Sequence, residues 1–523
     1  HIPVLLLLIG FMLAVRLQAL DNFRRDGAIF FRGNDPWYHF REISYLVEHF
    51  PSTIPFDVMT NYPQGTSAEQ FGTLYDQLVA GVILLTSFGD PSQNHIGMVM
   101  LLSTPVFAAA AVIPVYLIAT RFTGRKPALV GATVFALLPG TVLSFSLVGF
   151  PDHSAAEVLF QALAVAAFVY ALTVAERDPL VWELVVDRDF DALRRPALYA
   201  TLAGIAAAMY MWAWPPGVLL VGFTGIFFAI KLTSDVYHGQ SPEPIAFVGA
   251  ISMTVAGLLL LVPLKHLDFG SATDFSLQQP VLSLGVAAGC VFLAALARQW
   301  ETRDLDDSLY PVAVGGILLA LAVVFRDYSQ SLLSSVISRI GFGTGATART
   351  VGEAQPFLSR GDPFDVIYSE YRLALFTALI ALLIILAKPL VTSDETRDTG
   401  YVVAALGTVG LLFLGTPLFE SIAGLLGTSW QLLGLFTVTG LVVGATLLHR
   451  YDAPDLYLVV WAGFILSAAF TQQRFNYYLA AVVAVFNAIF IAQIAGYIDI
   501  RSVGVSARES VESLDGWQVI AIV

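Results

Sequence analysis

The sequence predicts an all-α, polytopic membrane protein with about 13–15 transmembrane helices and two long external loops. The first observation is composition: the 523 residues are 57% hydrophobic and only 13% charged, whereas soluble domains carry about 25% charged residues. The mean hydropathy is +0.73. The second observation is a series of apolar runs of about 20 residues, the length that a helix needs to cross a bilayer. The third is the gathering of arginine and lysine in alternate loops, which is typical of polytopic membrane proteins.

The apolar runs divide the chain into spans and loops. The first run, from 2 to 20, is too long for a signal-peptide core and lacks a small-residue cleavage site, so we expect a retained helix. A last run begins at Trp517 and continues to the end of the sequence. Together with the first run, the expected helices before the last run lie near residues 2–20, 95–120, 127–147, 155–175, 196–213, 216–233, 244–264, 280–298, 309–326, 370–390, 400–417, 429–448, 455–471 and 475–497.

Two loops between the expected helices are long, and long loops in compact proteins usually have a function. They span about 21–94 and about 327–369. The second contains a run of glycine and other small residues from 341 to 348, so we expect this loop to be mobile. The first contains apolar residues at helical spacing, which predicts an amphipathic helix at the membrane surface. These residues are Ile43, Leu46, Val47 and Phe50.

The basic residues also assign the two sides of the membrane. If the amino terminus lies inside, every second loop is internal, and basic residues occur in most of these internal loops, which fits the positive-inside rule. The same alternation places Asp35, Asp152, Glu353 and Arg474 at the outer face, which predicts one external site. The basic residues of the internal loops are Arg121, Arg125, Lys126, Arg188, Arg194, Arg195, Arg298, Arg303, Arg450, Arg501 and Arg508.

Charge and cysteine content exclude several classes of protein. The net charge is −13 and the chain has only four lysines. Such an acidic chain lacks the basic face that nucleic acid binding needs, so we expect no nucleic acid partner. An acidic, lysine-poor composition suits high salt, where charges are screened, and indicates a halophilic archaeon. The single cysteine, Cys290, excludes an intrachain disulfide and a cysteine-based metal site.

Each of the four outer residues also has an ordinary structural interpretation, which the sequence leaves open. Asp35 and Asp152 each precede an expected helix and could serve as helix N-caps. Glu353 could be a solvated loop residue, and Arg474 an arginine that extends from the membrane interface to water. Trp214, at an expected outer boundary, could belong to an aromatic belt or contact a lipid phosphate.

Four stretches that contain these residues occur in order and cover essentially the whole chain. Together they resemble the motifs of the catalytic subunit of oligosaccharyltransferases, of the archaeal AglB type. The stretches are Asn34-Asp35-Pro36-Trp37-Tyr38-His39-Phe40-Arg41, then Gly149-x-x-Asp152-x-x-x-x-Glu157, then Thr350-Val351-Gly352-Glu353-x-Gln355-Pro356, and finally Gln473-Arg474-Phe475-x-Tyr477-Tyr478.

The resemblance implies a fold and an activity. The fold is that of a GT-C-type glycosyltransferase. The activity is metal-dependent transfer of a glycan, with inversion, from a dolichol-phosphate-type lipid carrier to the asparagine amide nitrogen of Asn-x-Ser/Thr in an acceptor protein. We therefore expect a monomeric catalytic subunit in the cell membrane, with its active site facing outside.

The resemblance also assigns roles to residues of this chain. Asp35 and Glu353 would act on the acceptor amide, and Asp35, Asp152 and Glu353 would hold Mn²⁺ or Mg²⁺, cations that favour oxygen ligands. Arg474 would bind the carrier phosphate, with Trp214 as a weaker candidate. The residues of the loop that closes over the acceptor would be Thr350, Val351, Gly352 and Gln355.

The chain departs from the family pattern at several places. The second motif of the family ends in Asp, Glu or His, and here that position holds Ser154 with His153 beside it, so either could complete the metal site. Gln70 stands where archaeal relatives often have histidine. Two spans beyond the usual thirteen lie between Glu353 and Arg474. The family's soluble external domain does not follow within the 523 residues, so we expect the transmembrane part of a longer protein.

Two other functions remain open on the sequence. Another lipid-linked glycosyltransferase, such as a protein O-mannosyltransferase, would share an acidic motif in the first external loop but not the Thr-Val-Gly-Glu stretch. A secondary transporter would show repeats and ionisable residues near the middle of the membrane.

Overall fold

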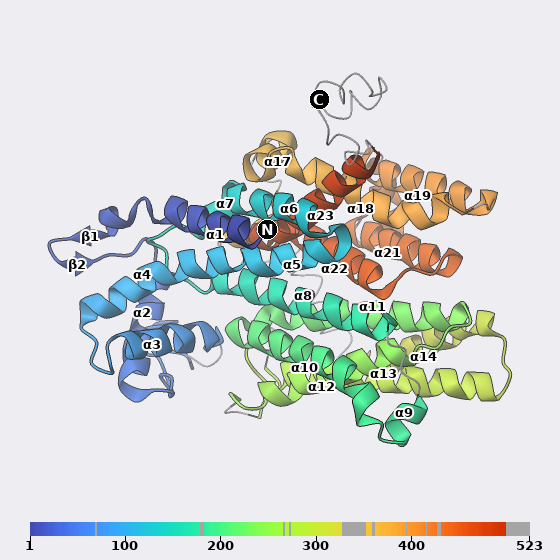
Figure 1. Cartoon of the computed structure of the whole chain (residues 1–523), viewed down its shortest axis with the longest axis horizontal. Coiled ribbons are helices and arrows are strands. Elements are labelled where there is room, and N and C mark those ends of the chain that lie inside the picture. The colour runs from blue at the N-terminus through green and yellow to red at the C-terminus, as the bar shows by residue number, and fades with distance from the viewer. Residues whose placement is uncertain are drawn as a thin grey trace.

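The structure is a computed structural model, and its described residues are almost entirely helical. They are residues 1–67, 71–177, 182–264, 267–270, 274–326, 352–357, 361–393, 395–414, 416–425 and 430–497. Most helices lie side by side along one axis of the molecule, as Figure 1 shows. Ten helical stretches of the described chain are long and apolar enough to span a membrane. The prediction of an all-α polytopic membrane protein is confirmed.

The first part of the chain, from Ile2 to Val186, contains α2 and α3 at one end of the bundle and the central helix α8. It contains one short hairpin, in which Arg24–Arg25 (β1) pairs antiparallel with Ala28–Ile29 (β2). Asp26 and Gly27 join the two strands with positive φ angles, as a tight hairpin turn requires. The helices are α1 (Ile2–Leu17), η1 (Leu20–Phe23), α2 (Asp35–His49), α3 (Leu74–Thr86), α4 (Gln93–Ala110), α5 (Val112–Thr123), α6 (Arg125–Leu137), α7 (Gly140–Ser144), α8 (Ser154–Arg177) and α9 (Trp182–Val186).

The rest of the chain surrounds α8 with further long helices. Ala213 ends one of them, and the residue that follows, Trp214, packs against Phe475 and Tyr478. The elements are α10 (Phe190–Ala213), η3 (Pro215–Val218), α11 (Leu219–Tyr237), α12 (Glu243–Leu260), α13 (Gln278–Thr302), η4 (Asp307–Leu309), α14 (Tyr310–Val324), η5 (Gly352–Ala354), α17 (Pro363–Tyr371), α18 (Ala374–Val391), α19 (Thr396–Leu414), α20 (Thr416–Leu425), α21 (Trp430–Leu448), α22 (Ala453–Thr471), η7 (Gln473–Phe475) and α23 (Asn476–Tyr497).

α8 lies at the centre of the bundle. It packs against α4, α5, α10, α12, α22 and α23, and most of its apolar window is buried inside the protein. A helix that is hydrophobic all round can lie in a protein core or face lipid, and the burial of α8 shows that it lies in the core. α23 packs in turn against α5, α6 and α18. α8 and α23 therefore pack against each other and share α5 and α22 as neighbours.

The amphipathic helix predicted in the first long loop is confirmed as α2, but its environment differs from the prediction. Ile43 and Leu46 are fully buried, because α2 packs against α3 and α4. Only Phe50, 48% exposed, extends away from the protein at the end of the helix. The apolar face of α2 thus fixes the helix to the bundle instead of lying on the membrane surface.

Three sequence-based boundaries change in the structure. The long first loop contains a second helix, α3, whose apolar length of 13 residues is too short for a usual span. The run expected at 95–120 forms two consecutive helices, α4 and α5. The run expected at 127–147 ends as a helix at Leu137, because Pro139 cannot continue the hydrogen-bond ladder. The run from Trp517 and most of the loop from 327 lie outside the described residues.

The end of the bundle away from α2 and α3 contains a buried charge cluster. Asp235 accepts hydrogen bonds from Lys231 Nζ at 2.6 Å and Arg450 Nε at 2.9 Å. Lys231 and Asp235 are each 1% exposed. The cluster joins α11 to the turn between α21 and α22. A buried carboxylate between two cations stabilises this junction, because loss of one partner leaves an uncompensated buried charge.

Replacing Asp235 with alanine should therefore lower the stability of the protein by about 3 kcal/mol, because Lys231 is left buried without its anion. Thermal unfolding in mild detergent would measure the loss. The matched control is Glu183→Ala, which breaks an exposed pair with Arg298 at 2.7 Å and should change the midpoint little. Equal small effects of both substitutions would contradict the assignment.

Candidate functional site

α2 places His39 inside the protein, although the residue is polar. The helix begins after Asn34, with Asp35 in its first turn and Pro36 beside it, an arrangement that favours a helix start. Its buried face continues from Pro36 through His39 to Ile43 and Leu46. Because residues three and four apart share a helix face, the same packing that buries the apolar residues also buries His39, which is 4% exposed.

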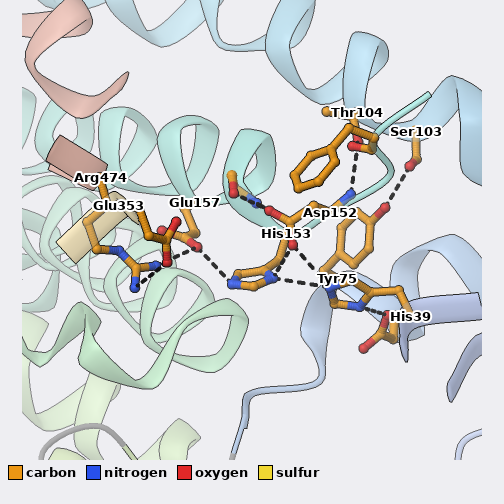
Figure 2. Close-up of polar contacts among 12 residues, drawn as sticks. His39, Tyr75, Ser103, Thr104, Asp152, His153, Glu157, Glu353 and Arg474 are labelled. Carbon is orange, nitrogen blue, oxygen red and sulfur yellow. Dashed lines mark hydrogen bonds and ion pairs between the residues drawn. The ribbon is translucent and has the colours of Figure 1, made fainter. Parts of the chain in front are cut away.

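Both ring nitrogens of His39 have partners. Nδ1 lies 2.7 Å from Oδ1 of Asp76, in the first turn of α3. Nε2 lies 3.3 Å from Oδ1 of Asp152 and 3.1 Å from Nδ1 of His153. The ring also packs edge-on against Tyr75, with the centroids 5.0 Å apart. Figure 2 shows His39 facing Asp152 and His153 at the start of α8. A histidine with this many fixed contacts has one orientation.

Asp152 is held at the start of α8 by contacts on both of its sides. Its backbone N–H contacts Thr104 Oγ1 at 3.2 Å. The backbone N–H of Ser154 donates to Oδ2 at 3.1 Å, and the Ser154 hydroxyl donates to the same atom. Gly149, at φ +102°, brings the preceding turn against Phe23, where a Cβ atom would clash with the ring. Asp152 thus caps α8 with Oδ2 and turns Oδ1 toward the two histidines.

One turn further along α8, Glu157 connects this group to the last described helix. Its Oε1 lies 3.1 Å from His153 Nε2. Its Oε2 accepts a hydrogen bond of 2.9 Å from the Tyr477 hydroxyl and another from the Tyr478 hydroxyl. Glu157 is fully buried. Since a carboxylate inside a membrane helix is costly unless it is paired, these contacts hold α8 and α23 in one register.

Arg474 lies in η7, the short turn that connects α22 to α23. Its guanidinium lies 3.6 Å from Glu353 Oε1 and 4.0 Å from Glu157 Oε1, and 4.9 Å from the centre of the Trp214 ring. Both ion-pair distances exceed a hydrogen bond, and the buried Nε has no hydrogen-bond partner in the described part of the protein. Figure 2 shows the Arg474 guanidinium beside the carboxylates of Glu353 and Glu157. The arginine is therefore positioned but retains donors for an anion.

The described end of the late loop, 352–357, packs directly on η7. The backbone carbonyl of Gln355 accepts a 3.0 Å hydrogen bond from the Gln473 N–H. Phe357 is buried against the rings of Tyr371 and Phe470. These contacts explain why Glu353, which is 39% exposed, faces Arg474.

Burial and neighbouring charges shift the pKa values of the group at the start of α8. Burial alone would lower the pKa of His39, but Asp76 and Asp152 outweigh it and raise the value to about 9. The pKa of His153 is likewise raised well above its usual range, against burial, by Asp152 and Glu157. Burial would raise the pKa of Asp152, yet the two histidines hold it well below its usual range. Without a metal, protons on the imidazoles balance the carboxylates, so a metal would have to displace them.

The structure brings together some of the predicted residues and leaves others apart. Among the described residues, His39, Asp152 and His153 form a group whose ligand atoms lie within 4.8 Å of one another. Asp35 and Glu353 do not belong to that group. Asp35 is exposed at the start of α2, one turn before His39 on the same helix face. Ser154, the other candidate ligand, donates its backbone N–H and its hydroxyl to Asp152 Oδ2.

The other predicted residues divide into two sets. Trp214 is buried beneath Arg474, and its contacts with Phe475 and Tyr478 rule out a position in an exposed aromatic belt. Gly352 and Gln355 lie in and beside η5. Thr350, Val351 and Gln70 lie outside the described residues.

Sequence reasoning missed the roles of His39, Asp76, Glu157 and the two tyrosines. A signal for His39 was present, because it falls on the apolar face defined by Ile43 and Leu46. Glu157, Tyr477 and Tyr478 stand in the motifs, but their contact joins positions 320 and 321 residues apart, so no local pattern indicates it.

Comparisons with known proteins agree with this architecture. The sequence pattern of the family described as "Oligosaccharyl transferase STT3, N-terminal" matches residues 5–298. The chain is 48% identical over its whole length to a dolichyl-monophosphooligosaccharide–protein glycotransferase, AglB, of Haloferax volcanii, and covers 50% of that protein. It is 26% identical, over 94% of its length, to dolichyl-phosphooligosaccharide–protein glycotransferase 3 of Archaeoglobus fulgidus, of which it covers 49%. The Haloferax relative fits the halophilic composition.

A solved structure shares the whole fold. The archaeal oligosaccharyltransferase AglB from Archaeoglobus fulgidus, in complex with an inhibitory peptide and a dolichol-phosphate, matches 100% of the chain with a TM-score of 0.75 and 20% identity. The chain covers 53% of that protein, so it spans about half the length of the relatives it matches.

The fold is that of a polytopic membrane protein of the GT-C type. Within that class, the family pattern covers more than half of the chain. The chain therefore belongs to the oligosaccharyl transferase STT3 family. This membership favours the first of the three functions that the sequence left open.

Glu42, on the buried face of α2, provides a test of how this end of the bundle is packed. Burial and the carboxylates of Asp76 and Asp57 raise the pKa of Glu42 to about 8. A carboxyl with a raised pKa binds its proton more tightly in the folded state, so its contribution to stability is present below its unfolded pKa and is lost as the pH rises toward 8.

The Glu42→Gln variant should therefore unfold a few degrees higher than the unchanged protein at pH 9, and at nearly the same temperature at pH 5. Thermal unfolding across this pH range would show the difference. Glu48→Gln, on the exposed face of the same helix, is the control and should not alter the pH dependence. A constant difference at all pH values would indicate that Glu42 does not titrate with folding.

Proposed function

We propose that the chain is the transmembrane catalytic part of an enzyme that moves a glycan from a dolichol-phosphate-type lipid carrier to the amide nitrogen of asparagine in Asn-x-Ser/Thr. The observation that carries the proposal is the contact of three distant motifs at one end of the bundle, where Arg474 faces both Glu157 and Glu353. Family membership supports it. So do related structures described with a dolichol-phosphate and with an acceptor peptide containing the NVT sequon.

Arg474 is the proposed anchor for the carrier phosphate. Its guanidinium lies over the Trp214 ring and is attracted by the charges of Glu157 and Glu353. Both carboxylates are too far away for a hydrogen bond, so the guanidinium can still donate to a phosphate. A planar guanidinium can donate two parallel hydrogen bonds to a phosphate. Glu157 keeps the arginine in place through a carboxylate that the two tyrosines already hold. The leaving phosphate would thus meet a positioned cation beside α8.

Asp35 and Glu353 are the proposed carboxylates for the acceptor. An amide nitrogen is a poor nucleophile, because its lone pair is delocalised into the carbonyl group. Carboxylates that accept hydrogen bonds from the amide N–H groups would orient the nitrogen toward the sugar. Glu353 is exposed enough to receive an acceptor. Gln355, together with Thr350, Val351 and Gly352, belongs to the segment that would close over the acceptor.

The residues at the start of α8 fit a divalent cation, Mn²⁺ or Mg²⁺. Asp152 Oδ1 and two imidazole nitrogens lie within ligand spacing of one another among the described residues. When bound, the cation would act as a Lewis acid that neutralises the charge of the leaving phosphate. Asp152 holds its place through Ser154 and Thr104. Asp35 and Glu353 remain the further ligands that the resemblance implies.

The proposed setting is the cell membrane, with the site facing outside and the chain acting as a monomeric catalytic subunit. The long apolar helices place it in a membrane. The internal loops are rich in arginine, and the positive-inside rule then puts His39, Asp152 and Arg474 on the outer side. The partners are the lipid-linked oligosaccharide and an acceptor protein, and nucleic acid is not among them.

The first test uses the full-length protein in membranes with a lipid-linked glycan and a fluorescent Asn-x-Thr peptide. We expect a metal-dependent shift of the peptide on a gel, and no shift for a peptide with glutamine in place of asparagine. Asp35→Ala and Glu353→Ala should each lower transfer at least about 100-fold, the usual cost of removing a group that acts on the reacting atoms. Asp21→Ala, in the same external segment as Asp35, is the matched control. Full activity of both variants would overturn the proposal.

Arg474 offers a second test, because it should act on one substrate only. Arg474→Gln should raise the KM for the lipid-linked glycan by roughly 10- to 100-fold, the value of a lost hydrogen bond to a charged group. The KM for the acceptor peptide should stay unchanged. Arg474→Lys should fall between the two, since it keeps the charge but not the planar fork. An equal rise in both KM values would place Arg474 elsewhere in the mechanism.

A further inference from the structure

Three potential metal ligands form a tight triangle between α2 and α8. His39 Nε2 lies 3.1 Å from His153 Nδ1 and 3.3 Å from Asp152 Oδ1. His153 Nδ1 lies 2.8 Å from the same Asp152 atom. All three side chains are buried or half-buried. Figure 2 shows them converging from two different elements.

The size of the triangle matches one face of an octahedron. Nitrogen and oxygen ligands lie about 2.1 Å from a divalent metal ion. Two such ligands at a right angle are then about 3.0 Å apart, and two at the tetrahedral angle about 3.4 Å apart. The distances of 2.8 and 3.1 Å lie close to the first value and that of 3.3 Å lies close to the second, so their mean of about 3.1 Å is nearer to the first value. One ion could therefore contact all three atoms with little movement of the side chains.

The second nitrogen of each histidine is also arranged as metal sites require. A histidine ligand usually donates its other ring N–H to a carboxylate, which fixes the ring and the tautomer. His39 Nδ1 lies 2.7 Å from Asp76, and His153 Nε2 lies 3.1 Å from Glu157. Both rings thus turn one nitrogen to a carboxylate and the other to the centre of the triangle. The carboxylate of Asp76 on α3 orients His39, and that of Glu157 on α8 orients His153.

The Asp152 carboxylate divides its two oxygens in the same way. Oδ2 accepts from the backbone N–H and the hydroxyl of Ser154. Oδ1 is left for the triangle. Ser154, which the sequence analysis considered as a ligand, therefore orients the carboxylate that binds.

From this geometry we infer that His39, Asp152 and His153 form a facial metal site with two imidazoles and one carboxylate, in which Asp76 and Glu157 orient the two histidines. The site departs from the oxygen-only set of Asp35, Asp152 and Glu353 that the resemblance implied. Three positions of the octahedron remain open to oxygen ligands. Asp35, one turn before His39 on α2, lies on the side from which such a ligand would come.

The ligand types also select the ion. Imidazole nitrogen is a common ligand of the divalent first-row transition metals, among which Mn²⁺ binds most weakly, whereas Mg²⁺ prefers oxygen ligands and keeps its water. A site with two imidazoles should therefore bind Mn²⁺ much more tightly than Mg²⁺. This narrows the choice of cation that the sequence left open.

Pulsed electron paramagnetic resonance of the purified full-length protein, loaded with Mn²⁺ alone, tests the site directly. We expect couplings to two directly bound ¹⁴N nuclei in the unchanged protein and to one in each of His39→Gln and His153→Gln. The matched control is His49→Gln, on the same helix as His39 but exposed, which should keep both couplings. Asp76→Asn should also keep both, while the affinity for Mn²⁺ falls roughly 10- to 100-fold.

Two results would overturn the inference. Saturable Mn²⁺ binding without nitrogen coupling in the unchanged protein would show an oxygen-only site. Absence of saturable Mn²⁺ binding would show that shared protons, not a metal, hold the three side chains together. Both results come from the unchanged protein, so they are informative even if a histidine variant does not fold. Competition between Mn²⁺ and Mg²⁺ provides a further check, because His39→Gln should weaken Mn²⁺ binding more than Mg²⁺ binding.

The role of the ion in catalysis rests on the proposed function, but its binding does not. The measurement needs neither a lipid carrier nor an acceptor peptide. Two nitrogen couplings in a protein that transfers no glycan would leave the metal site intact and overturn the proposed function. Glycan transfer by a protein that shows no nitrogen couplings would support the proposed function and overturn the metal site.

Discussion

The carboxylate of Glu157 is the constraint on which the site end of the molecule depends. It is fully buried in the central helix α8, where an unpaired charge would be strongly unfavourable. Its partners are His153 on one side and the hydroxyls of Tyr477 and Tyr478 on the other. These contacts fix the position of α23 along the axis of α8. The position of Arg474, directly before α23, follows from that register.

The fold could be predicted from the sequence to the level of spans and sides. Apolar length identifies helices such as α8 and α10, because a membrane span has no other way to satisfy its backbone. The length of an apolar run fails to identify a helix that is shorter than a usual membrane span. The 13-residue helix α3 is too short to count as a span, and it was assigned to a loop. The surface position expected for α2 also failed, because periodicity shows which residues share a face but not what covers that face.

The site could be predicted only in part, for the same physical reason. Asp152 and Arg474 were found because their motifs stand beside span boundaries, where a charge is conspicuous. His39 lies inside one of those motifs, but its role depends on Asp76, which is brought to it by the packing of α3 on α2. The roles of Tyr477 and Tyr478 depend on Glu157, more than 300 positions earlier. No local pattern carries such a pairing, and only the packed structure supplies it.

The turn η7 and helix α23 close the described bundle, and this has a consequence for biogenesis. A ribosome delivers α2 and α8 to the membrane long before it has made Tyr477 and Tyr478. During that interval Glu157 lies in a hydrophobic span without its two hydroxyl donors, and His153 is the polar partner that the chain already provides. Insertion of α23 ends this period by supplying both tyrosines at once. Nascent chains that stall before α23 would therefore expose a carboxylate that lacks two of its hydrogen bonds, the kind of defect by which membrane quality control can recognise an unfinished bundle.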